Sequence, residues 1–349
     1  RARAEAMAAR LDSLACHITS RQLNHVEAAE LLRNGAVVGM PTETVYGLAA
    51  DARNPEAVRQ IFAAKGRPAD NPLIVHIAEM RALEQVAATV PPLAEKLAER
   101  FWPGPLTMIL PKRKEIPEIT SGGLDTVGIR MPSHPVARAL IQLSGVPIAA
   151  PSANISGYPS PTTAQHVMRD MQGKIAAVVD GGACSVGVES TVIALEPNGT
   201  VRILRPGFVT KEMLEEVAPE VTLDPAILHQ LQEGQTVRSP GMKYQHYSPR
   251  AHVILVEGSW QNFAALAEQN RADGVYALVF DGEETMLSLP CLTYGRSGRE
   301  QAQQIFSKLR ELDDDGAQKV YVRAPKPEGI GLAVYNRLIR AAGFEVIQV

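Results

Sequence analysis

Strands and helices alternate along most of this chain, and that alternation restricts the fold more than any other feature of the sequence. Runs rich in Val, Ile and Leu predict strands at 36–40, 72–77, 105–110, 126–131, 146–150, 176–180, 191–195 and 201–204. Amphipathic segments predict helices at 54–65, 91–101, 134–144 and 163–172, the first capped by Asn54 with Pro55 at its first position. Because some strands follow one another without a helix, we expect an α/β domain with a mixed sheet.

The pattern becomes more regular after residue 250. Strands are predicted at 252–257, 275–280, 319–324 and 344–349, and helices near 260–270, 299–312 and 330–342. Such alternation is typical of a small doubly wound α/β domain. Residues 218–250 are punctuated by Gly, Pro and Ser and carry Tyr and His, which favours a linker or lid. We therefore expect a flexible segment at 1–19, a first domain at 20–217, a linker or lid at 218–250 and a C-terminal domain at 251–349.

Composition restricts the class of protein. The 349 residues are many for one compact domain, and 35 basic against 38 acidic residues exclude a generally basic coat for nucleic acid. Cys16, Cys184 and Cys291 lie far apart without metal-ligand spacing, which indicates reduced thiols, a cytoplasmic location and no protein metal site. No apolar run approaches the roughly 18–20 residues of a membrane span, so we expect no membrane partner. The Arg-containing residues 1–10 predict a frayed terminus or a start at Met7 more than a targeting remnant.

Any phosphate site in this chain must be of an unusual kind, because the common signatures are absent. The sequence has no GxxxxGK[ST] loop, no GxGxxG fingerprint, no HExxH and no GxSxG. Polar side chains gather instead where predicted strands end. Thr42, Glu43, Thr44 and Tyr46 follow the strand at 36–40, at the kind of position where α/β folds bind ligands. A polar turn with capping hydroxyls explains this segment equally well.

The stretch 63–77, AAKGRPADNPLIVHI, follows a predicted helix and carries two fixed cations. A helix dipole accounts for Lys65 at the helix end. It accounts less well for Arg67, which Gly66 and Pro68 hold on a restricted backbone that suits binding of phosphate oxygens. His76 lies in the following strand and, taken alone, is more often a hydrogen-bonded core residue than a ligand.

Further polar groups occur at other strand ends. Arg130 lies within a β run and requires either a carboxylate partner or a ligand, with the two about equally probable. Ser152, Asn154, Ser156 and Ser160 precede a helix and suit an anion, although a ligand-free loop is the alternative. Glu189, Ser190 and Thr191 enter a strand, and Arg205 ends another. Each signal is weak alone, but together they are not typical of a core.

Several segments resemble a known family. PTETVYGL, KGRPADNPLIVHI, WPGPLT, GIRMP, APSANISGYPSPT and ESTVI, in this order, are similar to the YrdC-domain family. The linker motif SPGMKYQHYSP and the terminal α/β domain extend the resemblance to the long two-domain threonylcarbamoyl-AMP synthases, over residues 20–349. The family's KxR and SxN signatures stand here as Lys65-Gly66-Arg67 and Ser152-Ala153-Asn154.

The resemblance implies a fold and a reaction. The fold would be a YrdC-like twisted mixed sheet with helices and a concave ligand surface, plus a small Rossmann-like C-terminal domain. The enzyme would be a cytoplasmic nucleotidyltransferase that converts L-threonine, bicarbonate (or CO2) and ATP into threonylcarbamoyl-AMP and pyrophosphate. Mg²⁺ would be held mainly by the ATP phosphates, without an organic cofactor. A separate threonylcarbamoyl transferase complex would then modify the tRNA adenosine next to the anticodon.

The resemblance also implies site residues. Lys65 and Arg67 would be catalytic, Arg130 would bind the threonine carboxylate, and residues 238–249 would form a lid that brings Tyr247 to the nucleotide. The implied threonine contacts are Thr44, His76, Arg130, Ala150 and Ser190. The implied ATP contacts are Lys65, Arg67, Asn71, Thr126, Ser152, Asn154, Ser160, Arg205 and Tyr247.

Two other functions compete with this interpretation. A cationic concave sheet could bind double-stranded RNA, although the positive charge is sparse and lacks interleaved aromatic residues; a weak RNA contact stays open. An enzyme of carbamoyl transfer from carbamoyl phosphate, as in hydrogenase maturation, would need additional regions and Cys pairs that this chain lacks.

Overall fold

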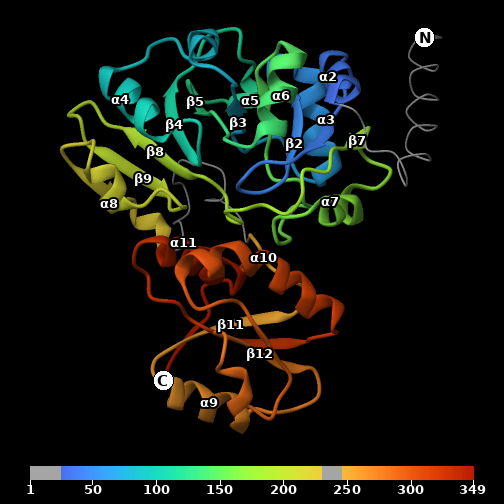
Figure 1. Cartoon of the computed structure of the whole chain (residues 1–349), viewed down its shortest axis with the longest axis vertical. Helices are drawn as coiled ribbons and strands as arrows, with labels where there is room; N and C mark the ends of the chain where they lie inside the picture. Colours follow the sequence, from blue (N-terminus) through green and yellow to red (C-terminus); the bar gives the residue numbers. More distant parts are fainter. Residues whose placement is uncertain (1–24, 230–245) are drawn as a thin grey trace.

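The computed structural model describes residues 25–229 and 246–349. The expected flexible segment 1–19, Cys16 and most of the predicted lid 238–249 therefore lie outside the described residues. Two sheets organise the described chain (Figure 1). We call the part that carries the larger sheet the first domain, and the part that carries the smaller sheet the C-terminal domain.

The first domain contains a mixed sheet of ten strands. In spatial order these are β10 (Val221–Leu223), β9 (Val201–Arg205), β8 (Thr191–Leu195), β4 (Leu106–Pro111), β5 (Thr126–Arg130), β3 (Ile74–His76), β6 (Ile148–Ala149), β2 (Gly47–Asp51), β1 (Val38–Met40) and β7 (Ala177–Val178). Parallel pairs such as β3–β5 and β4–β8 alternate with antiparallel pairs such as β4–β5 and β2–β6. The expectation of a mixed sheet is confirmed.

The C-terminal domain has a sheet of five strands, all paired in parallel. Their order is β13 (Cys291–Thr293), β12 (Val275–Val279), β14 (Lys319–Arg323), β11 (His252–Glu257) and β15 (Val346–Gln348). A parallel sheet needs helical crossovers, and these place helices on both of its faces. The expected small doubly wound domain is confirmed.

Helices cover the faces of both sheets. They are α2 (His25–Arg33), α3 (Pro55–Lys65), α4 (Pro92–Phe101), α5 (Glu118–Ser121), α6 (Pro135–Ser144), α7 (Ala164–Met171), α8 (Lys211–Glu215), α9 (Trp260–Gln269), α10 (Gly298–Asp314) and α11 (Ile330–Ala341), with short 3₁₀ turns at Met80–Gln85, Pro225–Ile227 and Glu284–Met286. Helices α10 and α11 lie between the two sheets, whereas α9 lies on the far side of the smaller one (Figure 1). Within the described ranges, no helix is long and apolar enough to cross a membrane.

The predicted end signals of α3 are confirmed. The side chain of Asn54 accepts hydrogen bonds from the amides of Glu56 and Ala57, and Pro55 is the first helical residue. Gly66 ends the helix with φ of 67°, a left-handed conformation that glycine adopts without a steric cost. The helix therefore ends at Lys65, whose side chain turns toward the centre of the first domain.

The main correction to the predicted strands concerns residues 47–51. The sequence pattern indicated no strand there, but Gly47–Asp51 is strand β2. The strand exists because it pairs with β1 on one side and with β6 on the other. The sequence pattern also did not indicate β10 and β13, which are three residues long and lie at sheet edges.

The order of the strands positions the functional residues. Strands β3 and β5 are parallel neighbours, in a register that places His76 opposite Arg130. Strand β6 pairs with β3 on the other side, and the chain that leaves β6 begins the 151–160 loop. Polar residues that are distant in sequence thus meet along the centre of the larger sheet.

Candidate functional site

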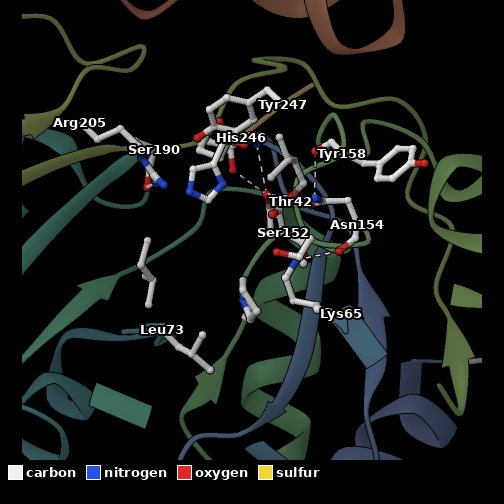
Figure 2. Close-up of a pocket in the computed structure, with 18 of the residues that line it drawn as sticks. Thr42, Lys65, Leu73, Ser152, Asn154, Tyr158, Ser190, Arg205, His246 and Tyr247 are labelled. Atoms are coloured by element: carbon white, nitrogen blue, oxygen red, sulfur yellow. Dashed lines mark hydrogen bonds between the residues drawn. The ribbon is translucent and has the colours of Figure 1, made fainter. Parts of the chain in front are cut away.

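A pocket opens over the centre of the larger sheet, and the described end of the linker covers it (Figure 2). The lining residues come from the β1–β2 loop, the end of α3, strand β3, the ends of β5, β6 and β9, the 151–158 loop, and residues 189–190 and 246–247. They are Thr42, Thr44, Val45, Gly47, Lys65, Arg67, Leu73, Ile74, His76, Arg130, Ala150, Pro151, Ser152, Asn154, Ser156, Gly157, Tyr158, Glu189, Ser190, Arg205, His246 and Tyr247.

Arg130 is buried at one end of the pocket and has a carboxylate partner within the protein. Its Nη2 forms an ion pair with Glu43, and its Nη1 donates to Thr44 Oγ1 at 2.8 Å. Burial alone would raise the pKa of Glu43, but the Arg130 charge and hydrogen bonds more than offset this, and the pKa is lowered. Glu43 is therefore ionised and holds the guanidinium in place. Arg130 thus has the carboxylate partner that one interpretation required, and because it also lines the pocket, its contact with a ligand stays a prediction.

His76 faces the same end of the pocket and is uncharged at neutral pH. Burial, together with the positive charge of Arg130, lowers its pKa to about 3. Its Nδ1 lies 3.1 Å from the carbonyl oxygen of Ile74, so the ring N–H at this position donates to the main chain. A neutral imidazole held in this way can hydrogen-bond a ligand without adding charge to the pocket.

Lys65 links the two signature motifs. Its Nζ donates to the carbonyl oxygens of Ser152 and, at 2.8 Å, Asn154. The side chain is 2% exposed, and burial, followed by repulsion from Arg67, lowers its pKa well below the usual value. The dipole of α3 thus accounts for the position of Lys65 in sequence but not for the direction of its side chain.

The 152–158 loop forms a second wall. Asn154 Nδ2 donates to the carbonyl oxygens of Ile155 at 2.9 Å and Tyr158 at 3.0 Å, and the amide of Ser156 donates to the Lys65 carbonyl at 3.0 Å. Figure 2 shows Ser152 and Asn154 beside Lys65, with the ring of Tyr158 pointing away from them. These bonds fix a polar loop around the Lys65 ammonium.

Ser190 and Arg205 form the opposite wall. Arg205 Nε donates to the Ser190 carbonyl at 3.1 Å, and Arg205 Nη2 lies 3.3 Å from Ser190 Oγ. The Ser190 hydroxyl also lies 2.8 Å from that of Thr107 on β4. The guanidinium of Arg205, at the end of β9, is therefore fixed by its contacts with Ser190, which immediately precedes β8.

His246 and Tyr247 cover the pocket at the point where the described chain resumes (Figure 2). Tyr247 is 5% exposed, has φ of 64° and packs against Phe306 of α10 with ring centroids 5.2 Å apart. Burial, followed by the charges of Arg340 and Arg67, lowers the pKa of His246 to about 3. The His246 Nε2 is buried and has no hydrogen-bond partner within the described residues.

The structure brings together most of the predicted site residues. Thr44, Lys65, Arg67, His76, Arg130, Ala150, Ser152, Asn154, Ser190, Arg205 and Tyr247 all line the pocket. Asn71, Thr126 and Ser160 do not. Thr126 begins β5, and Ser160 is buried and donates to Glu189.

Asn71 is fully buried just before β3. Neither atom of its side-chain amide has a hydrogen-bond partner within the described chain. A buried amide without partners is costly, and a bound water or ligand can supply the missing hydrogen bonds. Because β3 and β5 are parallel, Asn71 and Thr126 lie toward the same end of these strands.

Sequence reasoning did not assign a role to two kinds of residue. Glu43 and Glu189 were noted only as polar residues at strand ends, although both form buried ion pairs beside the pocket. Arg337 of α11, the partner of Glu189, was not noticed at all. A cation in an amphipathic helix is normally solvent-exposed, and only the docking of the two domains buries this one.

The pocket is lined by more cationic than acidic side chains. Lys65, Arg67, Arg130 and Arg205 all line it, whereas Glu189 is the one acidic side chain among the lining residues. Within the described ranges, no three His, Cys, Asp or Glu side chains form a group that could hold a metal ion. The arrangement can bind a carboxylate at the Arg130 end and phosphates near Lys65 and Arg67.

Comparisons with known proteins agree with this geometry. Residues 30–207 match the Sua5, YciO and YrdC family described as "Telomere recombination". Residues 209–343 match the family described as "Threonylcarbamoyl-AMP synthase, C-terminal domain".

The chain is also similar to curated proteins over most of its length. It is 46% identical over 331 residues to the threonylcarbamoyl-AMP synthase of Pyrococcus abyssi, which covers 92% of this chain and 95% of that protein. Identity to the threonylcarbamoyl-AMP synthase of Bacillus subtilis is 45% over 330 residues, covering 92% of this chain and 94% of the relative. The crystal structure of P. abyssi Sua5 complexed with L-threonine matches with a TM-score of 0.86 at 45% identity, covering 93% of this chain and 96% of that one. On this evidence, the chain belongs to the threonylcarbamoyl-AMP synthase family, in its two-domain Sua5 form.

Proposed function

We propose that this protein is an L-threonylcarbamoyladenylate synthase, which converts L-threonine, bicarbonate or CO2, and ATP into threonylcarbamoyl-AMP and pyrophosphate. The observation that carries the proposal is the buried, cation-lined pocket that joins the KxR and SxN motifs through the Lys65–Asn154 contact. The reaction brings together a carboxylate, a carbamate and a triphosphate, all of them anionic. A pocket of fixed cations, hydroxyls and amides can position them and stabilise the leaving pyrophosphate.

Threonine occupies the Arg130 end of the pocket in this proposal. Arg130 binds its carboxylate, and Thr44, His76, Ala150 and Ser190 surround the rest of the molecule. The L-threonine in the similar P. abyssi structure supports threonine as the substrate. The neutral state of His76 suits this position because the ring adds no charge that would compete with Arg130 for the carboxylate.

ATP occupies the Lys65 and Arg67 side of the pocket. Lys65 and Arg67 contact its phosphates, Ser152, Asn154, Ser160 and Arg205 contact the nucleotide, and Asn71 and Thr126 extend the site toward the other end of β3 and β5. The unsatisfied amide of Asn71 supports this placement, because a nucleotide can supply the missing partners.

The chemistry is nucleotidyl transfer. The threonine amine captures CO2 as a carbamate, a carbamate oxygen attacks the α-phosphorus of ATP, and pyrophosphate leaves. Lys65 and Arg67 act as catalytic residues by neutralising charge that develops on the transferring phosphoryl group. Tyr247 covers the site and excludes water from an adenylate that would otherwise hydrolyse.

Mg²⁺ enters with ATP in this proposal and is held mainly by the phosphates, with no organic cofactor. The donor set fits this arrangement, because Glu189, the acidic residue of the lining, already binds Ser160 and Arg337. When bound, Mg²⁺ neutralises phosphate charge and keeps several waters.

The product passes to a threonylcarbamoyl transferase complex that modifies tRNA next to the anticodon, and the reaction takes place in the cytoplasm. Double-stranded RNA binding is less well supported as an alternative. Lys65, Arg130 and Arg205 are 2%, 3% and 7% exposed. An RNA duplex cannot reach cations that are buried to this degree, so the pocket does not support this alternative, and a weak RNA contact elsewhere on the surface stays open.

Threonine-dependent release of pyrophosphate from ATP in bicarbonate buffer tests the proposed function. We expect release that requires all three substrates, together with a product that has the mass of threonylcarbamoyl-AMP. Release that is independent of threonine, or no release at all, would overturn the proposal. Double-stranded RNA serves as the parallel probe, and tight, salt-dependent binding of it would support the alternative.

A further inference from the structure

The C-terminal domain places one arginine directly behind the wall of the first domain's pocket, in contact with the lining residue Glu189. Arg337 of α11 is completely buried. Its Nε donates to Glu189 Oε2 at 2.8 Å, its Nη2 to the Glu189 carbonyl at 3.1 Å, and its Nη1 to the Pro206 carbonyl at 2.9 Å. A single guanidinium thus binds two main-chain positions and a carboxylate across the domain boundary.

The two main-chain positions flank residues that line the pocket. Glu189 precedes Ser190, which lies immediately before β8, and Pro206 follows Arg205 at the end of β9. Ser190 and Arg205 also contact each other through the 3.1 Å bond from Arg205 Nε to the Ser190 carbonyl. Arg337 therefore fixes the separation of the two strand ends that present these residues.

Arg337 also controls the charge of the pocket. Glu189 is 7% exposed, and its carboxylate accepts from Ser160 and Arg337. Burial alone would raise its pKa, but the charges of Arg337 and Arg205 more than offset this, and the pKa is lowered. The carboxylate is thus ionised in the lining of a site for phosphates. Without Arg337 its charge would oppose the binding of a polyanion.

A third contact connects Arg337 to the covering residue. The guanidinium carbon lies 5.6 Å from the centroid of the Tyr247 ring, within the range of a cation–π interaction. Two other buried arginines also reach the first domain: Arg340 of α11 donates to the Ala226 carbonyl at 2.8 Å, and Arg310 of α10 pairs with Asp170 on α7 and donates to the Pro159 carbonyl. Asp170, the carboxylate partner of Arg310, does not line the pocket, whereas Glu189 does.

We propose that Arg337 is a positioning residue for ATP: from the C-terminal domain it neutralises Glu189 and fixes the strand ends that carry Ser190 and Arg205. The C-terminal domain is then a working part of the catalytic site rather than an appended module. This inference rests on the proposed function, since it assigns Arg337 to the nucleotide half of that site.

Steady-state kinetics of the full-length protein test the inference. Arg337→Met should raise the KM for ATP at least tenfold and the KM for threonine much less. Arg337→Lys keeps the charge but loses the planar fork, so it should give an intermediate KM for ATP. Arg310→Met is the matched control, because it removes another buried interdomain arginine, whose carboxylate partner Asp170 does not line the pocket, and should leave the KM for ATP within about twofold.

A second substitution separates the effect of the Glu189 charge from the effect of the lost contacts between the two domains. Glu189→Gln in the Arg337→Met background removes the uncompensated carboxylate. The KM for ATP of this double variant should be at least threefold lower than that of Arg337→Met alone. An Arg337→Met enzyme with an unchanged KM for ATP would overturn the inference. So would a double variant with no recovery, or an Arg310→Met enzyme with an equal loss of ATP affinity.

A structural readout keeps the test independent of turnover. Amide hydrogen exchange of residues 188–207 should become faster in Arg337→Met than in Arg310→Met, because only the first change releases the carbonyls of Glu189 and Pro206. Equal exchange in the two variants would contradict the positioning role. If the wild-type protein releases no threonine-dependent pyrophosphate, the proposed function fails; if it does and Arg337→Met behaves like wild type, this inference alone fails.

Discussion

The Lys65 ammonium group lies 2.8 Å from the carbonyl oxygen of Asn154, a contact between two residues 89 positions apart in the chain. Nζ also donates to the Ser152 carbonyl, so its protein partners are neutral acceptors rather than a carboxylate. A buried lysine in such surroundings is electrostatically incomplete, and an incoming phosphate can supply the missing negative charge. This relationship explains why a lysine that is hidden in the free protein can still be part of a nucleotide site.

We predict that ATP binding is accompanied by proton uptake at Lys65 at pH values above its lowered pKa. Burial lowers the pKa of Lys65 in the free protein, and a nearby triphosphate should raise it again. ATP affinity should therefore decrease as the pH rises above the lowered pKa, since the neutral amine must first gain a proton. Titration calorimetry in buffers of different ionisation enthalpy measures this uptake. Wild-type heats that do not depend on the buffer, or a Lys65→Met variant with the same uptake as wild type, would contradict the prediction.

Substitution of Arg67 should selectively impair the use of ATP. We expect Arg67→Ala to lower kcat/KM for ATP at least a hundredfold, which corresponds to about 2.7 kcal/mol of lost transition-state stabilisation. Arg59→Ala, on the preceding helix α3, is the matched control, because Arg59 is exposed and its ion pair with Glu56 is worth little. Normal kinetics in Arg67→Ala would assign this arginine to the end of α3 rather than to the phosphates.

Because Arg130 pairs with Glu43, we predict that the free energy of unfolding and the binding of threonine are coupled. Glu43→Gln leaves Arg130 buried without its charged partner, and the free energy of unfolding should decrease by about 3–5 kcal/mol. Because the threonine carboxylate can replace the missing charge, saturating threonine should raise the melting temperature of this variant more than that of wild type. Equal shifts would show that threonine does not bind at Arg130, and an unchanged free energy of unfolding would show that the pair does not stabilise the fold.

Buried histidines should make the protein unstable in acid. The pKa of His76 is about 3 in the folded state and about 6.5 in an unfolded chain, so the unfolded state binds more protons between these values. The stabilisation from a neutral His76 is complete above pH 6.5 and decreases by up to about 1.4 kcal/mol for each pH unit below it. The pKa of His246 is lowered similarly and adds to the effect. Urea unfolding at pH 7 and pH 5 measures it, and His76→Gln should show a shallower decrease; equal slopes would exclude His76 as a cause.

Much of this architecture follows from local sequence patterns, and the exceptions have a common physical origin. The Asn54 cap, the Pro55 position and the strand ending at His76 depend on neighbouring residues, which local patterns describe well. Strand β2 depends on pairing with distant strands, and its Gly- and Ala-rich residues have no strong β preference of their own. The burial of Arg337 depends on the contact between two domains, and no pattern within α11 indicates it.

The candidate site also combines features that neighbouring residues determine with features that depend on contacts between distant residues. Arg67, Arg130, Ser152 and Asn154 attracted attention because strand ends and restricted turns leave local signals, and the resemblance to the family then implied their roles. The carboxylate partners of the cations could not be predicted, because Glu43 and Arg130 meet only after β1 and β5 join the same sheet. The motifs could therefore predict which residues line the pocket, whereas the charge balance within it required the three-dimensional arrangement.

Tyr247 provides the most direct test of the cover over the pocket. Its ring packs between Phe306 and Arg337, and its φ of 64° is unfavourable for any residue other than glycine. We expect Tyr247→Ala to reduce threonine-dependent turnover at least tenfold and to increase the fraction of ATP hydrolysed without product, because water then reaches the adenylate. Tyr247→Phe keeps the ring and should retain most of the activity. Tyr247→Gly separates the ring from the backbone, since glycine adopts this φ without strain but supplies no cover. If glycine and alanine impair turnover equally while phenylalanine does not, the ring itself protects the intermediate; if alanine and glycine both leave turnover and the product ratio normal, Tyr247 does not cover the reacting groups.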